Sequence, residues 1–276
     1  MRPQPQPVTD PADPRVADFF SLNDPELRRR REQPDGWGAK GGFFVAEGAL
    51  VIRRLLLSPY PVRAVLVTAQ GRAALDEDLR GVDAPVYEVT QALMTSITGF
   101  HFHRGALASA ARLPHPDLGT VAAGADLLVV VEGVTDNENL GALFRNAAAF
   151  GAQGLVLDAT SADPLYRRTV RVSMGQVLRV PSTRVRSAVD AIEELHRLGF
   201  EVLALTPSAS AEEVRTVAPR PRQALLVGAE GPGLSEAALA AADRRLKITM
   251  APGVDSLNVA TAAAIALHHL ARLESP

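Results

Sequence analysis

The sequence of 276 residues contains no cysteine, only two lysines and no apolar run long enough to cross a membrane. Without cysteine, the chain has no disulfides, no thiol catalysis and no thiolate metal sites. A transmembrane helix needs about 20 consecutive apolar residues, so we expect no membrane span. The proline-rich N-terminus lacks the apolar segment of a secretion signal, and a cytoplasmic location is the default expectation.

The overall charge is close to neutral, with 29 basic and 31 acidic side chains and a net charge of −2. Whole-chain electrostatics therefore do not by themselves predict a nucleic-acid-binding protein. Every basic position except Lys40 and Lys247 is arginine, which suits contacts with phosphate, although a preference for GC-rich codons explains the same bias. Apolar residues make up 47% of the chain and charged residues 22%, as is typical of a globular protein with a core.

The first half of the chain predicts a small α/β domain. Residues 1–14 contain five prolines and few apolar residues, which predicts a disordered tail. Strands and helices then alternate over residues 15–112, and the two prolines and one glycine of residues 113–121 predict a linker. The elements expected here are helices at 22–32, 47–57, 73–80 and 91–97 and strands at 43–46, 62–68, 85–89 and 105–111.

The second half, residues 122–276, predicts a parallel sheet covered by helices on both faces. The continuous apolar run at 127–131 is typical of a strand buried on both sides. The last helix is almost wholly Ala, Val, Ile and Leu, so we expect it to be buried. The expected elements are strands at 127–131, 155–157, 177–180, 202–205, 224–227 and 246–250 and helices at 139–150, 164–174, 188–198, 236–242 and 259–273.

Three loops follow predicted strands at the edge where open parallel sheets bind ligands. In the first, Arg145 is a charge within an apolar helix and must reach a partner or solvent. Asn139, six residues earlier, cannot share its position on that helix. The second loop, residues 228–233, has glycines that let a ligand approach the backbone, but its G-x-x-G-x-G spacing differs from that of dinucleotide-binding proteins. In the third, Asp255, Ser256 and Asn258 are more polar residues than one helix cap needs.

Two further basic stretches admit two interpretations each. The run Arg28 to Arg31 is either a solvated helix face or an RNA contact. His101 and His103, beside Arg104, lack an evident third ligand for a metal. Their loop is either a plain connection or a surface suited to stacking on RNA bases.

The sequences of the three loops, together with their order along the chain, identify a family. The chain resembles the SpoU–TrmH family of RNA ribose 2′-O-methyltransferases, within the SPOUT superfamily. The resemblance rests on Asn139-Leu-Gly-Ala-Leu-Phe-Arg145, on Leu226-Val-Gly-Ala-Glu-Gly-Pro-Gly-Leu-Ser235 and on Ser256-Leu-Asn-Val-Ala260. The first half more weakly resembles the L30e-like substrate-binding domain often joined to this family, through Phe44-Val-Ala-Glu-Gly48 and His103-Arg-Gly-Ala-Leu107.

The resemblance implies a fold, a cofactor and a set of site residues. It implies S-adenosyl-L-methionine bound in a C-terminal trefoil knot, a homodimer to which the helix at 259–273 contributes, an RNA substrate and no metal. The residues implied for the reaction are Arg145, Asn139, Glu230, Ser256 and Asn258. Those expected at the cofactor are Thr206, Gly228, Ala229, Gly231, Ile248, Met250 and Leu257. From their charge rather than from the resemblance, the arginines expected at the RNA are Arg28, Arg30, Arg104, Arg167, Arg168 and Arg171.

The implied reaction is methyl transfer to a ribose 2′-hydroxyl, which is a weak acid and needs activation. In the family Arg145 is thought to activate it, but a guanidinium stays protonated, so holding the neighbouring phosphate suits Arg145 better. Ribosomal RNA is preferred over transfer RNA as the substrate because of the appended first domain. The alternatives are a non-catalytic RNA-binding or assembly protein of the same fold, and a nucleotide-dependent enzyme of the Rossmann type.

Overall fold

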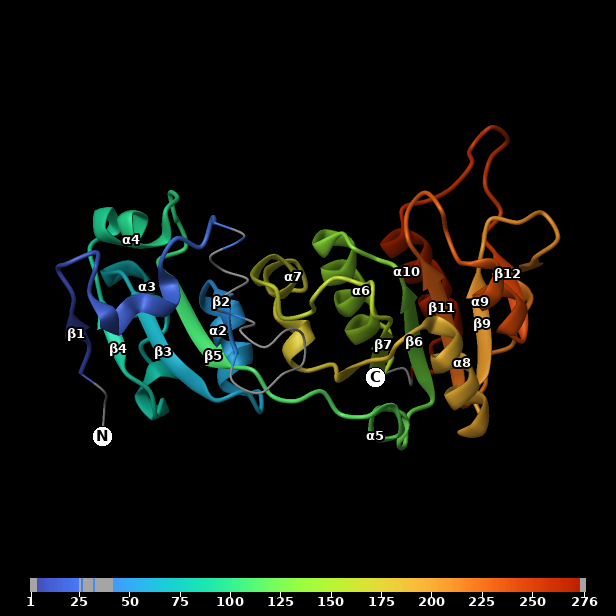
Figure 1. Cartoon of the computed structure of the whole chain (residues 1–276), viewed down its shortest axis with the longest axis horizontal. Helices are drawn as coiled ribbons and strands as arrows, with labels where there is room; N and C mark the ends of the chain where they lie inside the picture. Colours follow the sequence, from blue (N-terminus) through green and yellow to red (C-terminus); the bar gives the residue numbers. More distant parts are fainter. Residues whose placement is uncertain (1–3, 25, 27–31, 33–41, 274–276) are drawn as a thin grey trace. The chain divides into compact units, whose positions relative to one another are not determined.

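The computed structural model describes residues 4–24, 26, 32 and 42–273 (Figure 1). Most of the helix predicted at 22–32 lies outside the described residues, as do Arg28 and Arg30. Within the part of the chain that is described, no helix is long and apolar enough to span a membrane.

The chain divides into two compact units. The first runs to Pro114 and includes Leu165–Arg179, and the second comprises His115–Pro164 and the chain from Val180 onward. The division at Pro114 falls within the stretch predicted as a linker. Leu165–Arg179, by contrast, lies inside the predicted second domain but packs with the first unit.

The first unit is built on a mixed five-stranded sheet in the order β1-β4-β3-β5-β2. Strand β5 runs antiparallel to β2 and β3, and the other pairs are parallel. The strands are β1 (Gln6–Pro7), β2 (Phe43–Glu47), β3 (Val62–Val67), β4 (Val86–Glu88) and β5 (Ala106–Ala111). The helices are η1 (Pro14–Phe19), α2 (Ala49–Leu56), α3 (Ala69–Ala74), η2 (Asp78–Gly81), α4 (Gln91–Thr98), α7 (Arg167–Val172) and η3 (Gln176–Leu178).

Strand β1 corrects the prediction of a disordered tail over residues 1–14. It pairs in parallel with β4, and the N–H of Val8 donates to the carbonyl of Glu88 at 3.0 Å. Val8 is only 3% exposed and packs in the same core as Val16 and Phe19. Proline is tolerated in this position because β1 is an edge strand, where only one side of the backbone needs partners.

The second unit contains a seven-stranded, wholly parallel sheet in the order β10-β12-β9-β11-β6-β7-β8. This confirms the predicted parallel sheet. The strands are β6 (Leu127–Glu132), β7 (Gly154–Leu157), β8 (Ser182–Arg184), β9 (Glu201–Leu205), β10 (Glu212–Glu213), β11 (Gln223–Gly228) and β12 (Arg244–Lys247). The helices are α5 (Leu118–Ala122), α6 (Asn137–Ala149), α8 (Ala188–Arg197), η4 (Val214–Thr216), α9 (Glu236–Ala241) and α10 (Val259–Leu270).

Helices cover both faces of this sheet. Leu128 and Val130 pack in one core cluster with Ile192 of α8 and Ala238 of α9. Successive strand residues point to opposite faces, so Val129, which is fully buried, faces the other side. There α6 and α10 pack against each other, and α10 also packs on β11. The alternation explains why the run at 127–131 is apolar throughout.

Several local predictions were wrong. The helix expected at 73–80 is instead two short helices, α3 (Ala69–Ala74) and η2 (Asp78–Gly81). The strand expected at 177–180 is the 3-10 turn η3, and β8 lies a few residues later, because a short apolar run fits a buried turn as well as a strand. Helix α5 begins inside the predicted linker, where Asp117 caps it by accepting the N–H of Thr120. Helix α10 is not wholly buried, since Ile265 is 41% exposed.

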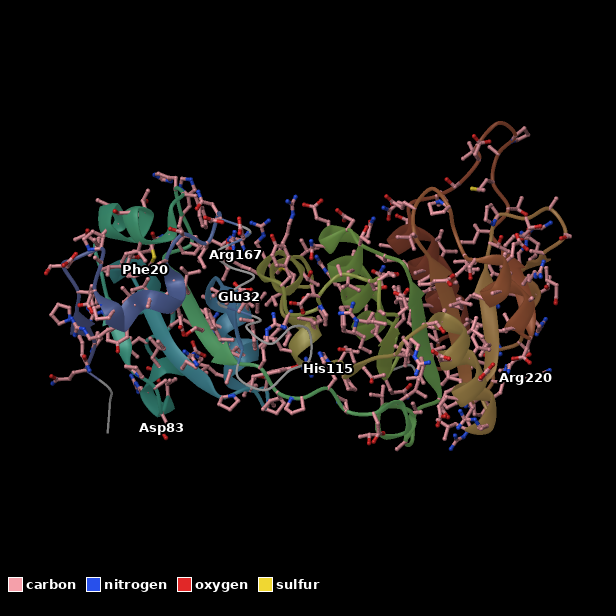
Figure 2. All side chains as sticks on the ribbon, in the orientation of Figure 1. Phe20, Glu32, Asp83, His115, Arg167 and Arg220 are labelled. Carbon is pink, nitrogen blue, oxygen red and sulfur yellow. The ribbon has the colours of Figure 1, made fainter. Side chains whose placement is uncertain are left out.

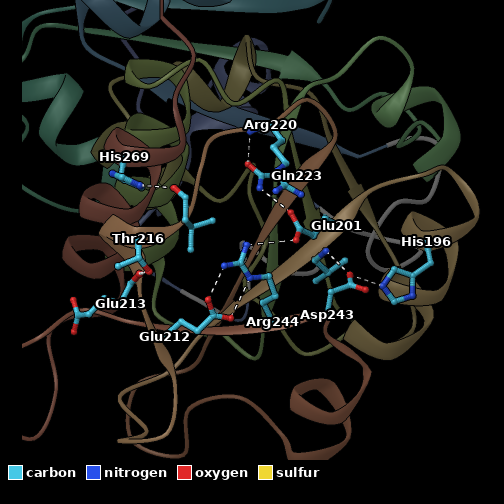
Figure 3. A network of polar contacts seen from close by, with 12 residues as sticks. His196, Glu201, Glu212, Glu213, Thr216, Arg220, Gln223, Asp243, Arg244 and His269 are labelled. Carbon is cyan, nitrogen blue, oxygen red and sulfur yellow. Dashed lines mark hydrogen bonds and ion pairs between the residues drawn. The ribbon is translucent and has the colours of Figure 1, made fainter.

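The amino ends of the strands in the second sheet are tied together by polar side chains (Figure 3). The buried Gln223, at the start of β11, donates from Nε2 to Glu201 at the start of β9 (2.8 Å). Arg244, at the start of β12, lies 3.7 Å from Glu201 and 2.6 Å from Glu212. His196 contacts Asp243 at 2.9 Å. The predicted reaction and cofactor residues follow the opposite, carboxyl ends of these strands.

Candidate active site

Four neighbouring parallel strands, in the order β12-β9-β11-β6, end at one edge of the second sheet. Carboxyl ends of parallel strands are where such sheets bind ligands. Asn139 lies beyond β6, Thr206 directly follows β9, Glu230 follows β11 and Ile248 follows β12. The sheet therefore brings together loops that are separated by more than 100 residues in the sequence.

Asn258 is the residue that connects these loops. Its Nδ2 donates to Asn139 Oδ1 at 2.7 Å and to Glu230 Oε1 at 2.6 Å. Its Oδ1 accepts the backbone N–H groups of Ala260 and Thr261 at 3.0 and 3.2 Å, which is the pattern of a helix N-cap. The side chain uses both of its donors and its acceptor. It therefore caps α10 and at the same time gathers two side chains from other loops.

Asn139 owes its position to the start of α6. Asp136 caps this helix by accepting the backbone N–H groups of Glu138 and Asn139, both at 2.8 Å. An acidic cap is favourable here because the helix dipole places positive charge at this end. Asn139 therefore sits in the first helical turn, with its side chain directed to Asn258.

Arg145 and Ser256 are not part of this cluster. Arg145 is exposed on α6, nearly two turns beyond Asn139, and its guanidinium has no hydrogen bond or ion pair with any described residue. Ser256 is also exposed, and the described part of the chain offers its hydroxyl no partner. Both groups are thus available to a ligand, but no contact in the chain fixes either of them.

The glycine-containing loop after β11 folds back on itself. The N–H of Gly233 donates to the carbonyl of Ala229 at 3.1 Å, and these two residues form an isolated antiparallel bridge. A Cβ on Gly228 would lie 2.5 Å from the carbonyl carbon of Gly233, so no other residue fits there. Gly231 has a φ of +85° and open space around its Cα. This loop places Glu230 against Asn258 and exposes backbone around Gly231.

Glu132 is a functional candidate that we did not predict from the sequence. It ends β6, and its two carboxylate oxygens accept the backbone N–H and the hydroxyl of Ser235, each at 2.8 Å. Ser235 in turn caps α9 by accepting the N–H of Ala238. Glu132 therefore fixes the far end of the glycine-containing loop. A carboxylate at the last position of a buried strand was a possible signal for this role.

Asp158 is a second functional candidate that we did not predict from the sequence. It is buried and accepts hydrogen bonds from the N–H of Gly133 (3.1 Å), the N–H of Ser161 (2.9 Å) and the hydroxyls of Thr160 and Ser161. Burial alone would raise the pKa of Asp158, but these hydrogen bonds outweigh it and hold the pKa below its usual value. The carboxylate thereby anchors the turn that leads from β6 into α6.

The residues predicted at the cofactor border the same edge. Ile248, Met250 and Leu257 are half-buried, and the N–H of Thr206 donates to the carbonyl of Leu246 at 2.8 Å. Half-exposed apolar side chains beside backbone groups and an open glycine suit a ligand that has a flat base and a polar sugar. The chemistry of these loops therefore fits an adenosyl group.

The four described arginines of the predicted RNA surface belong to the first unit: Arg104, Arg167, Arg168 and Arg171. Three of them surround the carboxylate of Glu47. A search of the described residues finds no cluster of three or more His, Asp or Glu side chains that could hold a metal ion.

Comparison with known proteins gives consistent matches to RNA methyltransferases. The family model described as the SpoU rRNA Methylase family matches residues 126–268. An uncharacterized tRNA/rRNA methyltransferase of Mycobacterium tuberculosis is 46% identical over 270 residues, which cover 97% of this chain and 92% of the relative. The 23S rRNA (guanosine(2553)-2′-O)-methyltransferase RlmP of Bacillus subtilis is 30% identical over 234 residues, covering 84% and 89% of the two chains.

A solved structure resembles the chain over nearly its full length. The SpoU methyltransferase AviRb of Streptomyces viridochromogenes, in complex with the cofactor AdoMet, superposes with a TM-score of 0.77. The sequence identity is 25%, and the match covers 94% of this chain and 97% of that one. The likeness therefore includes both units.

Proposed function

Since the chain belongs to the SpoU rRNA methylase family of S-adenosylmethionine-dependent RNA methyltransferases, we propose that it methylates the 2′-hydroxyl of one ribose in ribosomal RNA. The 2′-O position is supported by the activity for which the Bacillus subtilis relative is named. A transfer RNA substrate is the alternative, since the Mycobacterium tuberculosis relative carries a name that covers both RNAs.

The observation that carries the proposal is the cluster of Asn139, Glu230 and Asn258. Each of the three stretches on which the family resemblance rests contributes one member, and hydrogen bonds of 2.7 and 2.6 Å join them. A Rossmann-type nucleotide enzyme is not supported by the G-x-x-G-x-G spacing of the loop that carries Glu230. We assign to the cluster the positioning of the ribose.

The cofactor residues line the same edge. We propose that the loops containing Thr206, Gly228 to Gly231, Ile248 to Met250 and Leu257 bind S-adenosylmethionine largely through backbone groups, within the trefoil knot that the family resemblance implies. The bound cofactor supplies a methyl group on a sulfonium, which reacts with an oxygen nucleophile. The apolar side chains of Ile248, Met250 and Leu257 would exclude water from this region.

Arg145 is assigned to the RNA phosphate next to the reacting ribose. Its guanidinium is exposed and free of partners among the described residues, and it is a fixed positive charge at neutral pH. Placed beside the phosphate, it orients the ribose and stabilises negative charge that develops on the 2′-oxygen. Ser256, equally free, is a second group available to the RNA.

Replacing Arg145 tests this assignment. Arg145→Ala should lower kcat by about 100- to 1,000-fold, as the loss of one electrostatic contact to a developing oxyanion does, while S-adenosylmethionine still binds. Arg145→Lys keeps the charge without the planar fork and should retain partial activity. Turnover of Arg145→Ala at the wild-type rate would remove Arg145 from the reaction.

The experiment that tests the proposed function is mapping of the methylated nucleotide. Purified protein and labelled S-adenosylmethionine are incubated with ribosomal RNA and with transfer RNA from cells lacking this protein, and the labelled residue is identified by nuclease digestion. Label on a single ribose of ribosomal RNA is the expected result. Label on a base contradicts the 2′-O assignment. Label on transfer RNA alone identifies transfer RNA, rather than ribosomal RNA, as the substrate. Cofactor binding without any label favours a non-catalytic RNA-binding protein.

A further inference from the structure

The first unit contains a group of arginines arranged around a single buried carboxylate. Glu47, at the end of β2, has a side chain that is only 5% exposed. Its Oε2 accepts a hydrogen bond from Arg167 Nη1 at 2.7 Å. Its Oε1 lies 3.7 Å from Arg104 and 3.8 Å from Arg171. We call Glu47 with these three arginines the Glu47 cluster.

The topology of the unit explains why these residues meet. Strand β2 pairs antiparallel with β5, with Glu47 opposite Leu107, so Arg104, just before β5, comes back beside Glu47. Helix α7 packs on β2. Arg167 and Arg171 are four residues apart on α7 and therefore lie on one face of the helix.

The local backbone is adapted to this arrangement. Gly48 follows Glu47 with a φ of +91°, and a Cβ there would lie 3.3 Å from Cδ of Arg104, so the arginine stem crosses the glycine closely. Helix α7 ends at Val172. Gly175 follows it with a φ of +82°, and Arg54 donates to the carbonyl of Met174. The surrounding chain therefore fixes both the Arg104 side chain and helix α7 next to Glu47.

The three arginines differ in their exposure and in how many of their N–H donors remain available to a ligand. Arg167, which is labelled in Figure 2, is 16% exposed, hydrogen-bonded to Glu47 and stacked 4.8 Å over the ring of Phe100. Arg104 and Arg171 are 51% and 35% exposed, and their contacts with Glu47 are long. Within the described residues neither of these two guanidinium groups makes a hydrogen bond, so almost all of their N–H donors remain available.

The charges do not balance. One carboxylate faces three guanidinium groups, and the most buried arginine neutralises it through a direct hydrogen bond. Two partly exposed positive charges are left over, held near each other by their common attraction to Glu47 Oε1. Among the described residues these two arginines have no carboxylate of their own, and two oriented arginines in that state are suited to a polyanion such as a nucleic-acid backbone.

We propose that the Glu47 cluster is a phosphate-binding surface for RNA, in which Glu47 and Arg167 position Arg104 and Arg171 for contacts with the sugar-phosphate backbone. The ring of Phe100 lies under Arg167, and the exposed His101 and His103 adjoin Arg104, so bases can stack beside the phosphate contacts. The inference rests on the proposed function only for the identity of the polyanion as RNA.

Paired charge removal tests the surface. The full-length double variant Arg104→Gln/Arg171→Gln should bind in vitro transcribed 23S rRNA roughly tenfold more weakly at about 150 mM KCl, and the slope of log affinity against log salt should fall by roughly 0.7 to 0.9 per lost contact. The matched control is Arg72→Gln/Arg80→Gln. It removes two charges of the same unit, each from a 49%-exposed arginine paired with its own acid, and should leave the slope unchanged. Equal slopes for the two double variants overturn the proposal.

Glu47→Gln separates positioning from net charge. Removing a negative charge should tighten binding to RNA if only the net charge matters. If Glu47 positions the arginines, the variant instead binds more weakly, at a temperature well below its melting point, and tighter binding overturns this role.

The same experiments can contradict the proposed function and the Glu47 cluster independently of each other. A wild-type protein that binds and methylates RNA but whose Arg104→Gln/Arg171→Gln variant keeps the wild-type affinity and slope contradicts only the Glu47 cluster. A wild-type protein that binds 23S rRNA, loses affinity in that variant and methylates no RNA contradicts only the methyl transfer. A wild-type protein with no salt-dependent affinity for any RNA contradicts both.

Discussion

At the scale of single residues, the side chain of Asn258 has two tasks. Its Oδ1 caps α10, and its Nδ2 donates to Asn139 and Glu230. Because the two tasks use different atoms, single substitutions can separate them. Asp158 is buried and has one task, which is to anchor Gly133 at the start of the turn into α6.

Asn258→Asp and Asn258→Ala form such a pair. Aspartate keeps the cap oxygen but replaces the donor with a second negative charge facing Glu230, so we expect near wild-type helix stability with methylation reduced by roughly 10- to 100-fold. Alanine removes both functions and should in addition lower the free energy of unfolding by about 1 kcal/mol. Denaturant unfolding and single-turnover methylation measure the two effects. Full activity of Asn258→Asp would show that the contacts with Asn139 and Glu230 do not matter for the reaction.

Asp158→Asn should destabilise the second unit in a pH-dependent way. The pKa of Asp158 in the folded protein is lowered, so its contribution to stability is fully present above the pKa of the unfolded chain and is lost as the pH falls through the folded pKa. We expect Asp158→Asn to lower the free energy of unfolding by roughly 1–3 kcal/mol at pH 7. The difference from wild type should shrink below about pH 4. Denaturant unfolding at several pH values tests this, and a constant difference down to pH 3 would contradict it.

At the scale of elements, contacts at its start and at its end fix the conformation of the glycine-containing loop after β11. At its start the backbone of Gly228 contacts that of Gly233 too closely for a side chain. At its end Glu132 holds Ser235, which begins α9. The loop is therefore a fixed structure between a strand and a helix, as a site that binds a ligand through backbone groups requires.

Two glycine substitutions in this loop should have unequal effects. Gly228→Ala places a Cβ 2.5 Å from the backbone of Gly233, so the loop must open, and we expect S-adenosylmethionine binding to be lost. Gly231→Ala meets open space but keeps a φ of +85°, which costs about 1–2 kcal/mol of strain and should weaken binding only moderately. Isothermal titration with S-adenosylmethionine compares them, and a stronger effect at Gly231 than at Gly228 would contradict the closed loop.

At the scale of the whole molecule, α10 presents an apolar residue to solvent. Ile265 is 41% exposed on a helix whose opposite face packs on α6 and β11. A single exposed apolar side chain is common on protein surfaces, so the homodimer that we propose, with α10 in the interface, rests on the family resemblance.

The oligomeric state should respond to α10 alone. Ile265→Glu should shift the protein from dimer to monomer in size-exclusion chromatography with light scattering, because burying a carboxylate in an apolar interface is costly. The control is Leu57→Glu, at an 86%-exposed leucine of the first unit, which should leave the mass unchanged. A monomeric wild-type protein, or a dimeric Ile265→Glu variant, would argue against this interface.

Most of the strands and helices of the second unit, and the order of the site residues along the chain, could be predicted from the sequence alone. Continuous apolar runs such as 127–131 marked the buried parallel strands, because such strands face helices on both sides. Motifs built on Asn139, Glu230 and Asn258 identified the family. Local chemistry suffices for these features, since periodicity, caps and glycines act over a few residues.

Which of these residues contact one another depends on the tertiary fold. The bond from Asn258 to Asn139 spans 119 residues and that from Arg167 to Glu47 spans 120. The pairing of β1, the anchoring by Asp158 and the packing of α7 with the first unit likewise depend on partners distant in sequence. Glu47 and Glu132 each end a buried strand, which marks the carboxylate but not its partners, because strand order and helix packing determine those. For that reason each arginine could be named from the sequence as a candidate RNA contact, but the role of Glu47 as their common partner could not.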